Sequence, residues 1–385
     1  MQKLTKILKL ASLTVALCRP SPAASEYVLV NNNNSVANYA TLYELSTKTG
    51  RLSKVSELRT GGQGFEGVGN LSATQQAISA DASCIFALDL HSSDIAAFSK
   101  ATGYKRVGSY FDQKLISGAE GDSVALSPSG RFLFASYSYT GNVGEWAVGQ
   151  DCALTLLWTS GDETGVGPLE ATPDSKYLLA RAGGGTQEYA LDEVTGGLTY
   201  IGTTAFRAGA CARESACLPY GIQITEDGKL AIFAGYAPDA RREHMIPLAL
   251  TARITPQGLL SPAVRSLTVE NDLRLSIFPF LSSAAYGGSG TIYFGVTSGG
   301  QYNPGVLTAD FTEKPVKFTV TNSTVANPQV GNIAVTGNLM VVAQYPNQIS
   351  VFRIKKNGSL KLLSTTTIDE KGEGLFSLSI FPNTR

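Results

Sequence analysis

The sequence is poor in the residue types on which most catalytic and metal centres depend. Its 385 residues include two histidines, five cysteines, three methionines and two tryptophans. The histidines, His91 and His244, lie far apart, and the chain has no His-Glu-x-x-His or paired Cys-x-x-Cys motif. It also lacks a Gly-x-Ser-x-Gly motif. These absences argue against a zinc hydrolase and against a hydrolase with a Ser/His/Asp triad.

Charge is also scarce, and the two signs balance. The chain has 31 basic and 31 acidic residues, and charged residues make up 16% of it. It therefore has no excess positive charge to attract nucleic acid or an anionic membrane surface. No stretch of about 12 residues after position 26 shows an apolar period of 3.6 residues. The 40 glycines and 16 prolines favour turns, so the composition predicts an all-β protein.

The first 25 residues form a separate segment. Lys3, Lys6 and Lys9 precede the short apolar run 10–17, and small residues follow at 23–25. This order is typical of a secretory signal, and the run is too short to span a bilayer. We expect a signal peptide at 1–25, and a secreted or periplasmic, monomeric domain at 26–385 with no membrane span.

The rest of the chain repeats a short apolar run, a turn of the Ser-Pro-Asp-Gly type and a second apolar run. Clear copies of the turn are 127–130, 172–175 and 225–228. Repeats of roughly 45–58 residues made of strands and turns predict propeller blades. Seven inner strands are expected to begin near these residues: Gln75, Ser123, Pro168, Pro219, Phe278, Val330 and Leu375.

The two ends of the repeat pattern complement each other. The segment 27–30 resembles a second strand of a blade, and 376–381 resembles a lone first strand. We therefore expect a seven-bladed β-propeller closed by pairing of the C-terminal strand with the N-terminal blade, which removes open sheet edges. The fifth blade is longer than the others, and we expect an insertion around 237–247.

Four cysteines remain after the expected signal segment. An even number in an oxidising compartment is typical of disulfides. The sequence favours a Cys211–Cys217 bridge across a small loop and, less strongly, a Cys84–Cys152 bridge between neighbouring blades. Free buried thiols are the alternative.

The loops that precede the inner strands should surround one end of the central channel. They hold more than twice as many acidic as basic residues. The predicted ligand-binding residues of this channel mouth are Glu66, Glu120, Asp122, Glu214 and Glu373. Clustered carboxylates favour a cationic ligand, and a hard cation such as Ca²⁺ could bind among them. No other cofactor is expected. The alternative is a solvated rim whose carboxylates point away from one another.

Catalysis at this mouth would need an acid–base pair and a group that holds the substrate. Glu120 or Asp122 could act as acid or base, and Arg207 or Arg213 could hold an anionic substrate. The segment 62–67 matches Gly-x-Gly-x-x-Gly, but no helix pattern follows, so we interpret it as a turn. The asparagines at 31–34 follow a strand and are interpreted as turn residues.

The blade turns, together with the Thr-Gly-x-Leu segments at 49–52 and 195–198 and the loop 89–94, resemble the lactonase-like seven-bladed propellers. These include proteins of the 6-phosphogluconolactonase and carboxymuconate-cyclase types, and they are similar to YVTN-type surface repeats. The enzymes of this family carry His and Arg where inner strands begin. This sequence has Thr74 and Asp122-Ser123 at those positions.

Two functions follow from these observations. The first is a non-catalytic extracytoplasmic binding or surface module that takes a small molecule or a protein at the mouth. The second is a hydrolase or isomerase that acts there on a lactone or a small carboxylic acid. The fold does not decide between them.

Overall fold

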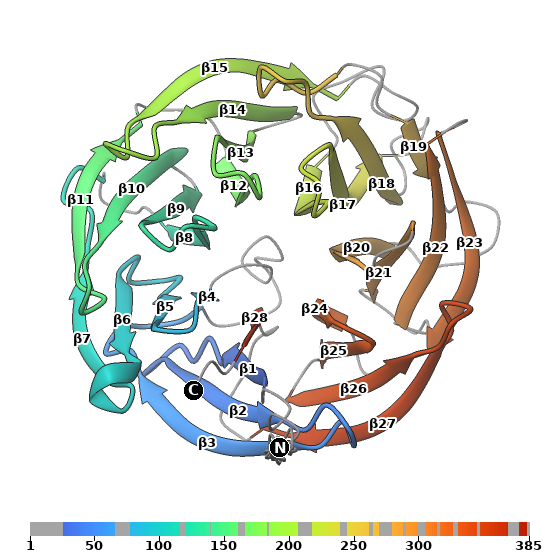
Figure 1. Cartoon of the computed structure of the whole chain (residues 1–385), viewed down its shortest axis with the longest axis horizontal. Coiled ribbons are helices and arrows are strands. Elements are labelled where there is room, and N and C mark those ends of the chain that lie inside the picture. Colours follow the sequence, from blue (N-terminus) through green and yellow to red (C-terminus); the bar gives the residue numbers. More distant parts are fainter. Residues whose placement is uncertain are drawn as a thin grey trace, which may run out of the picture.

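The computed structural model describes most of the chain after the N-terminal segment. The described residues are 26–65, 78–115, 120–138, 140–160, 166–182, 185–206, 218–238, 245–261, 265–268, 279–287, 290–298, 305–313, 316–325, 330–344, 347–368 and 377–382. They form seven four-stranded antiparallel sheets arranged in a ring (Figure 1). The structure is therefore the seven-bladed propeller that the repeats predict.

The blades are numbered along the chain from the one that contains the N-terminal strand. Blade 1 consists of β28 (Ser377–Pro382), β1 (Glu26–Asn31), β2 (Tyr39–Leu45) and β3 (Leu52–Arg59). Blade 2 consists of β4 (Ile78–Ala80), β5 (Cys84–Leu88), β6 (Ile95–Ser99) and β7 (Lys105–Tyr110). Blade 3 consists of β8 (Glu120–Leu126), β9 (Phe132–Ser138), β10 (Asn142–Val148) and β11 (Leu154–Thr159). Blade 4 consists of β12 (Val166–Ala171), β13 (Tyr177–Ala182), β14 (Gly185–Leu191) and β15 (Leu198–Ala205).

The remaining three blades follow the same order of strands, from the centre of the ring outward. Blade 5 consists of β16 (Leu218–Ile224), β17 (Leu230–Pro238), β18 (Met245–Arg253) and β19 (Arg265–Thr268). Blade 6 consists of β20 (Pro279–Tyr286), β21 (Thr291–Ser298), β22 (Gly305–Glu313) and β23 (Val316–Val325). Blade 7 consists of β24 (Val330–Thr336), β25 (Leu339–Gln344), β26 (Gln348–Ile354) and β27 (Leu360–Thr367).

The ring closes through the C-terminal strand, as predicted. Strand β28 pairs with β1 in antiparallel register from Glu26↔Pro382 to Asn31↔Ser377. Blade 1 thus combines the last strand of the chain with the first three. Pairing at this position covers the backbone edge of β1, which would otherwise be open to solvent.

Hydrophobic packing lies between the blades. The described core residues form seven clusters, each of which joins two neighbouring blades. Both faces of a blade are therefore covered, which is why β5 and β25 are buried along their whole length. Burial of this apolar surface at about 25 cal/mol per Å² supplies the main force that holds neighbouring blades together.

Blade 5 corrects one expectation. Residues 237–238 and 245–247 of the predicted insertion belong to β17 and β18, which pair as far as Pro238↔Met245. The predicted insertion is therefore too wide at both ends, and its middle, residues 239–244, lies outside the described residues, so an inserted loop there stays a prediction.

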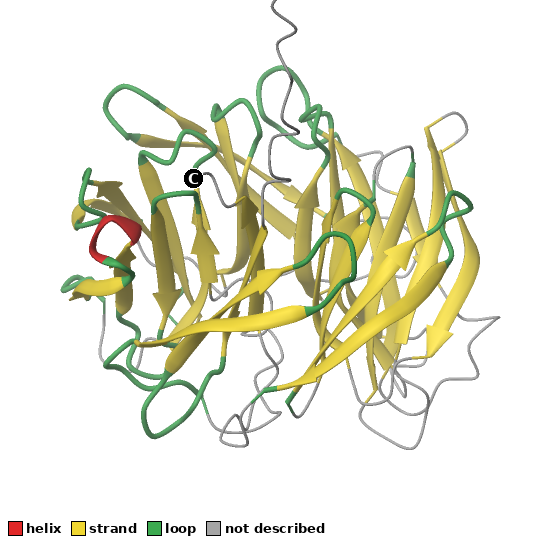
Figure 2. Ribbon diagram, turned by 60° about the horizontal axis from the view of Figure 1, so that its bottom comes forward, coloured by secondary structure: helices red, strands yellow, loops and turns green. Residues whose placement is uncertain are grey.

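The antiparallel order of strands sorts the loops onto two faces of the ring. Loops between second and third strands share one face with the segments that lead to the next blade; we call this the mouth face, and it includes 32–38, 60–65 and 89–94. The hairpins between first and second, and between third and fourth, strands form the turn face, which includes 172–176, 225–229 and 254–260. Figure 2 shows loops gathered at the two ends of the strands. No helix in the described part of the chain is long and apolar enough to cross a membrane.

Candidate functional site

Two of the predicted mouth residues lie on the inner strand of blade 3. Glu120 begins β8, and a β-bulge between Gly121 and Ser123 follows it. Asp122 lies within this bulge and is 1% exposed, whereas Glu120 is only partly buried. The structure therefore leaves one of the two carboxylates open to solvent. The other predicted residues of this face, Glu66, Glu214, Glu373, Arg207 and Arg213, lie outside the described residues.

A buried carboxylate that the sequence analysis did not select lies on the same face. Asp89 follows β5 directly and is 0% exposed. Its Oδ1 accepts hydrogen bonds from Asn38 Nδ2 at 2.7 Å and from Thr60 Oγ1 at 2.8 Å. Both donors belong to blade 1, so Asp89 joins blades 1 and 2. The signal for this role is the Asp-Leu start of the loop 89–94, which marks the resemblance but not the contacts.

The second carboxylate of this loop, Asp94, lies close to the first. Its Oδ1 accepts a hydrogen bond from Ser92 Oγ, and its Oδ2 accepts one from Ser109 Oγ. Asp94 is only partly buried, and Ser109 is exposed. Burial, then the negative charge of Asp94, raises the pKa of Asp89 to about 7, although hydrogen bonds from Asn38, Thr60 and the Gly62 amide act in the opposite direction. Asp89 is therefore a carboxyl group that holds a proton more tightly than usual.

The asparagine run has the structural role that was predicted for it. Asn31 Nδ2 donates to Leu88 O at 3.0 Å, and Asn32 Nδ2 donates to Tyr39 O at 3.0 Å. Asn33 adopts a left-handed backbone with φ of 48°. The first contact ties the end of β1 to blade 2 and the second closes the loop 32–38 within blade 1, so the run orders the mouth face.

One predicted disulfide is present. Cys84 of blade 2 and Cys152 of blade 3 are bonded, with 5.5 Å between their Cα atoms. Both residues are buried in the cluster that joins these two blades. Cys211 and Cys217 lie outside the described residues, so their pairing stays a prediction.

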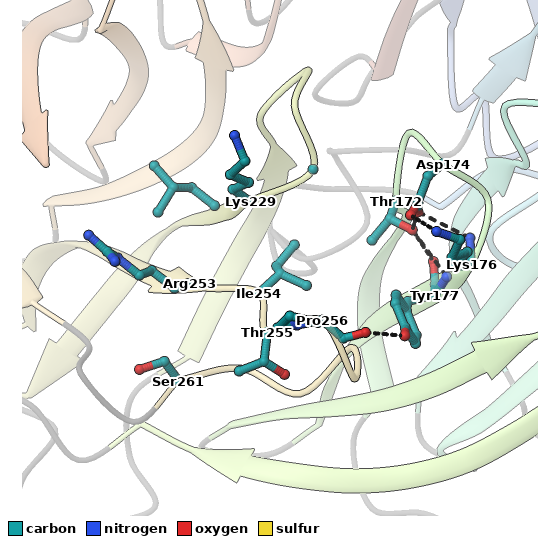
Figure 3. Close-up of a pocket in the computed structure, with 12 residues that line it drawn as sticks. Thr172, Asp174, Lys176, Tyr177, Lys229, Arg253, Ile254, Thr255, Pro256 and Ser261 are labelled. Atoms are coloured by element: carbon teal, nitrogen blue, oxygen red, sulfur yellow. Dashed lines mark hydrogen bonds and ion pairs between the residues drawn. The ribbon is translucent and has the colours of Figure 1, made fainter.

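A pocket of about 670 Å³ lies on the turn face, between blades 4 and 5. Three segments line it: the turn 172–177, the turn that ends at Leu230, and hairpin residues 253–256 together with Ser261 (Figure 3). Three basic side chains, Lys176, Lys229 and Arg253, border it, with Asp174 as its one acidic lining residue. Figure 3 shows Lys229 and Arg253 on one side of the pocket and Lys176 on the other.

Two copies of the repeat turn, one from blade 4 and one from blade 5, lie beside this pocket. Thr172 Oγ1 donates to Asp174 Oδ1, and Thr225 Oγ1 donates to Asp227 Oδ1, each at 2.7 Å. The lysine two residues after each aspartate forms an exposed ion pair with it, Lys176 at 3.1 Å and Lys229 at 3.0 Å. Hydrogen bonds from Thr225 and Lys229 lower the pKa of Asp227, so this carboxylate remains ionised.

The hairpin of blade 5 is fixed against the turn of blade 4. Tyr177 Oη donates a 2.7 Å hydrogen bond to Pro256 O. Gly258, at φ of +81°, lies against the Tyr177 ring so closely that an added Cβ would collide with it. Tyr177 and Pro256 both line the pocket, so its shape depends on how the two blades meet.

The junction before this one shows why the pocket is open. At the corresponding position of blade 3, Arg131 reaches the hairpin of blade 4 and donates to the carbonyl oxygens of Glu193 and Val194. Lys176 occupies the matching place in blade 4, but it pairs with Asp174 of its own turn. The residue after the turn thus bridges to the next hairpin at the first junction but not at the second, where Tyr177 makes the contact instead. The turn sequences alone did not reveal this difference.

Arg253 differs from the two lysines of the pocket in its polar contacts. It ends β18 and is exposed, and its guanidinium makes no hydrogen bond or ion pair with any residue that the structure describes. An arginine with its five donors unused is suited to a carboxylate or phosphate. The sequence analysis missed this group because nothing in the repeat pattern places it beside Lys229.

Metal-binding residues do not gather in the described parts of the chain. Within them, no group of three or more His, Cys, Asp or Glu side chains is placed to hold a metal ion. The expected Ca²⁺ site at the channel mouth includes three residues outside these parts, so it stays a prediction.

Comparison with known proteins shows which solved structures share this fold. No protein-family model matches the sequence, and no curated protein matches it. Among solved structures, a protein from Bacteroides fragilis described as a proposed 6-phosphogluconolactonase is 15% identical, with a TM-score of 0.67 over 94% of this chain and 99% of that one.

Two further structures have no stated activity. A protein from Lactobacillus plantarum is 15% identical, with a TM-score of 0.68 over 92% of this chain and 99% of that one. A functionally unknown protein from Desulfotomaculum acetoxidans is 12% identical, with a TM-score of 0.62 over 93% of this chain and 99% of that one. The chain therefore has the lactonase-like seven-bladed propeller fold, and identities this low establish the fold alone.

Proposed function

We propose that this chain is an exported, monomeric binding module that holds a small anionic ligand in the turn-face pocket. The observation that carries the proposal is the unused guanidinium of Arg253 at the edge of a pocket that Lys176 and Lys229 also border. The ligand class is a carboxylate or phosphate small enough for about 670 Å³.

The electrostatics support an anion because the basic groups are only partly neutralised. Asp174 and Asp227 pair with Lys176 and Lys229, but these ion pairs are exposed and weak in water. Arg253 adds a positive charge with no acidic partner among the described residues. Lys176 and Lys229 can exchange their present partners for a ligand at little cost, because screened surface pairs contribute about 0–1 kcal/mol.

Export is supported by two independent features. The N-terminal segment has the order of a secretory signal, and the Cys84–Cys152 disulfide is typical of an oxidising compartment. Secretion in the native host, followed by mass analysis of the mature N-terminus, tests this part. A mature protein that retains residues 1–25 contradicts it.

Titration of the purified protein with citrate, gluconate and inorganic phosphate, followed by calorimetry and melting temperature, tests the binding site. At least one anion should bind at micromolar to millimolar concentration, and Arg253→Gln should weaken binding about tenfold or more. Arg51→Gln is the matched control, because Arg51 is an exposed arginine on another hairpin of the same face. Binding that both variants leave unchanged, or no binding by any anion, refutes the proposal.

The alternative is a hydrolase or isomerase acting at the channel mouth. Its supporting observation is Glu120, a solvent-accessible carboxylate where an inner strand begins. The buried positions of Asp122 and Asp89 favour the binding module, since neither carboxylate can meet a substrate without a rearrangement. Hydrolysis of a panel of lactones by the wild type, with loss of turnover in Glu120→Gln, would decide for the enzyme.

A further inference from the structure

Two neighbouring hairpins of the turn face carry only basic charge. They are residues 45–52, between β2 and β3 of blade 1, and residues 353–361, between β26 and β27 of blade 7. Neither contains Asp or Glu, and together they hold six basic residues: Lys48, Arg51, Arg353, Lys355, Lys356 and Lys361. We define the basic patch as Lys48 together with the four basic residues of 353–361. The balanced total charge of the chain conceals this local excess.

Contacts between blades 7 and 1 hold the two hairpins together. Arg353 Nη2 donates to the carbonyl oxygens of Thr47, at 3.2 Å, and of Lys48, at 2.8 Å. Ser364 Oγ of β27 donates to Gly50 O at 2.7 Å. Figure 1 shows β3 and β27 at the outer edge of the ring, on the side away from the pocket between blades 4 and 5. The basic patch is therefore one continuous region that two blades build.

The charges of the basic patch face solvent. Its four lysines are exposed, and Arg353 is partly buried with Lys361 opposite it on β27. Among the described residues, none of the five forms an ion pair. Three acidic residues lie on strands beside the hairpins, and the one ion pair that they form there joins Glu57 to Lys54, outside the patch: Glu44, Glu57 and Asp310. Like charges held close together repel, so a ligand of opposite charge is favoured.

We propose that the basic patch binds an acidic polysaccharide, a linear glycan that carries carboxylates or sulfates along its length. A single small anion gains little from one exposed and screened charge. A linear polyanion contacts several of these side chains at once and releases counterions as it binds. This site is independent of the turn-face pocket beside Arg253, which lies between other blades.

The distribution of charge over the turn face favours a chain-like ligand over a flat anionic surface. The hairpins of blades 2 to 5 on this face carry seven carboxylates: Asp81, Asp151, Asp174, Asp192, Glu193, Glu226 and Asp227. A lipid bilayer that met the whole face would bring its phosphates against these groups. A polysaccharide follows blades 7 and 1 alone, along the outer edge where Lys361 lies on β27.

The composition of the two hairpins favours a glycan over single-stranded nucleic acid. Neither hairpin contains Phe, Tyr or Trp, the side chains on which bases stack. Both contain short polar residues, whose hydroxyl and amide groups suit the hydroxyl groups of sugars: Ser46, Thr47, Thr49, Asn357 and Ser359. The predicted export of the chain also places it outside the cytoplasm, apart from cellular nucleic acid.

Calorimetric titration of the purified protein with defined polysaccharides tests the proposal. Heparin supplies sulfates, polygalacturonate supplies carboxylates, and dextran is the neutral control. We expect at least one of the two acidic glycans to bind in about 50 mM NaCl, and to bind about tenfold or more weakly in about 300 mM NaCl. Dextran should not bind. Failure of both acidic glycans to bind at the lower salt concentration overturns the proposal, and so does equal binding of dextran.

A triple variant, Lys48→Gln, Lys355→Gln, Lys356→Gln, assigns the binding to the patch. It removes three exposed charges, so it should weaken polysaccharide binding about tenfold or more and leave the melting temperature unchanged. If this variant fails to fold, Lys356→Gln alone should still weaken binding severalfold.

A second triple variant is the matched control, because it removes the same net charge at exposed positions outside the patch: Arg59→Gln, Lys105→Gln, Lys114→Gln. It should keep binding within about twofold, since charges farther away than the Debye length are screened. Equal losses in the two triple variants would mean that the polysaccharide responds to the overall charge, and would overturn the assignment to the patch.

Vesicles of phosphatidylglycerol and phosphatidylcholine, and poly(dT), test the class of ligand. At equal concentration of negative charge, both should bind more weakly than the acidic glycans. Tighter binding of the vesicles would assign the patch to a membrane, and tighter binding of poly(dT) would assign it to nucleic acid; either result overturns the proposal. The turn-face pocket is tested separately, by small anions and Arg253→Gln, so each proposal can fail without the other.

Discussion

Glu145 and Glu188 occupy the same position in successive blades. Each is the last residue of a third strand before the β-bulge in its pairing with the fourth strand, and each is 0% exposed. The blades with a described bulge at this point carry other residues there: Leu42, Ala97, Thr308 and Val351. Two buried glutamates thus stand where the other blades have uncharged side chains, which makes blade packing depend on pH.

This relationship predicts that the protein is more stable in mild acid. Burial is the main reason that the pKa values of Glu145 and Glu188 rise to about 7, and it raises that of Glu170 to about 8. The folded state therefore keeps protons that the unfolded chain, with ordinary values near 4.5, releases. The contribution of these three groups to the free energy of unfolding is complete below about pH 4.5, and it is lost as the pH rises to about 8.

The double variant Glu145→Gln, Glu188→Gln should flatten this profile. Each glutamate should account for about 1 kcal/mol or more of the stability lost between pH 5 and pH 8. Urea unfolding at four pH values measures the slope. Glu226→Gln, at an exposed turn position, serves as the control, and equal slopes for the two variants would contradict the prediction.

The disulfide between blades 2 and 3 should contribute directly to stability. Cys84 and Cys152 are 68 residues apart in the chain, and such a crosslink stabilises by about 2–4 kcal/mol. Denaturant unfolding with and without reductant should show this loss in the wild type. The double variant Cys84→Ala, Cys152→Ala should be less stable and should not respond to reductant; a wild type insensitive to full reduction would show that the bond contributes little.

Removal of the closing strand should abolish cooperative folding. Deletion of residues 375–385 removes β28, exposes the edge of β1, and opens the buried cluster that contains Leu378. Circular dichroism during heating measures the effect. A truncated protein that melts at the temperature of the full chain would show that closure does not support the ring.

Alanine substitutions at Gly258 and Gly103 distinguish the cost of a steric clash from the cost of backbone strain. Gly258→Ala adds a methyl group against the Tyr177 ring at a positive φ, whereas Gly103, at φ of +72°, has no heavy atom within 4 Å of the corresponding position. Gly103→Ala should cost about 1 kcal/mol from strain alone. Gly258→Ala should cost at least about 1 kcal/mol more, measured by urea unfolding; equal costs would mean that the ring moves aside freely.

Much of the fold follows from the sequence because the blade signals are local. The turns 127–130, 172–175 and 225–228 mark where inner strands end, and the lone apolar segment near the C-terminus predicts the closing strand. The Cys84–Cys152 bridge could also be predicted, since both residues fall on the same face once the blades are numbered. The bounds 237–247 of the predicted insertion were too wide, because the composition of a strand end does not distinguish it from a loop and both ends of the segment belong to β17 and β18.

The sites depended on contacts that only the tertiary structure decides. The turns at Arg131 and Lys176 have the same form, yet Arg131 bridges to the next hairpin and Lys176 pairs with its own turn, which leaves the pocket open. Asp89 and Gly62 are 27 positions apart in the chain, and their meeting depends on how blade 2 docks on blade 1. Strand and turn patterns are set by neighbours along the chain, whereas burial, charge and convergence are set by which blades meet, and this physical difference divides what the sequence determined from what the fold decided.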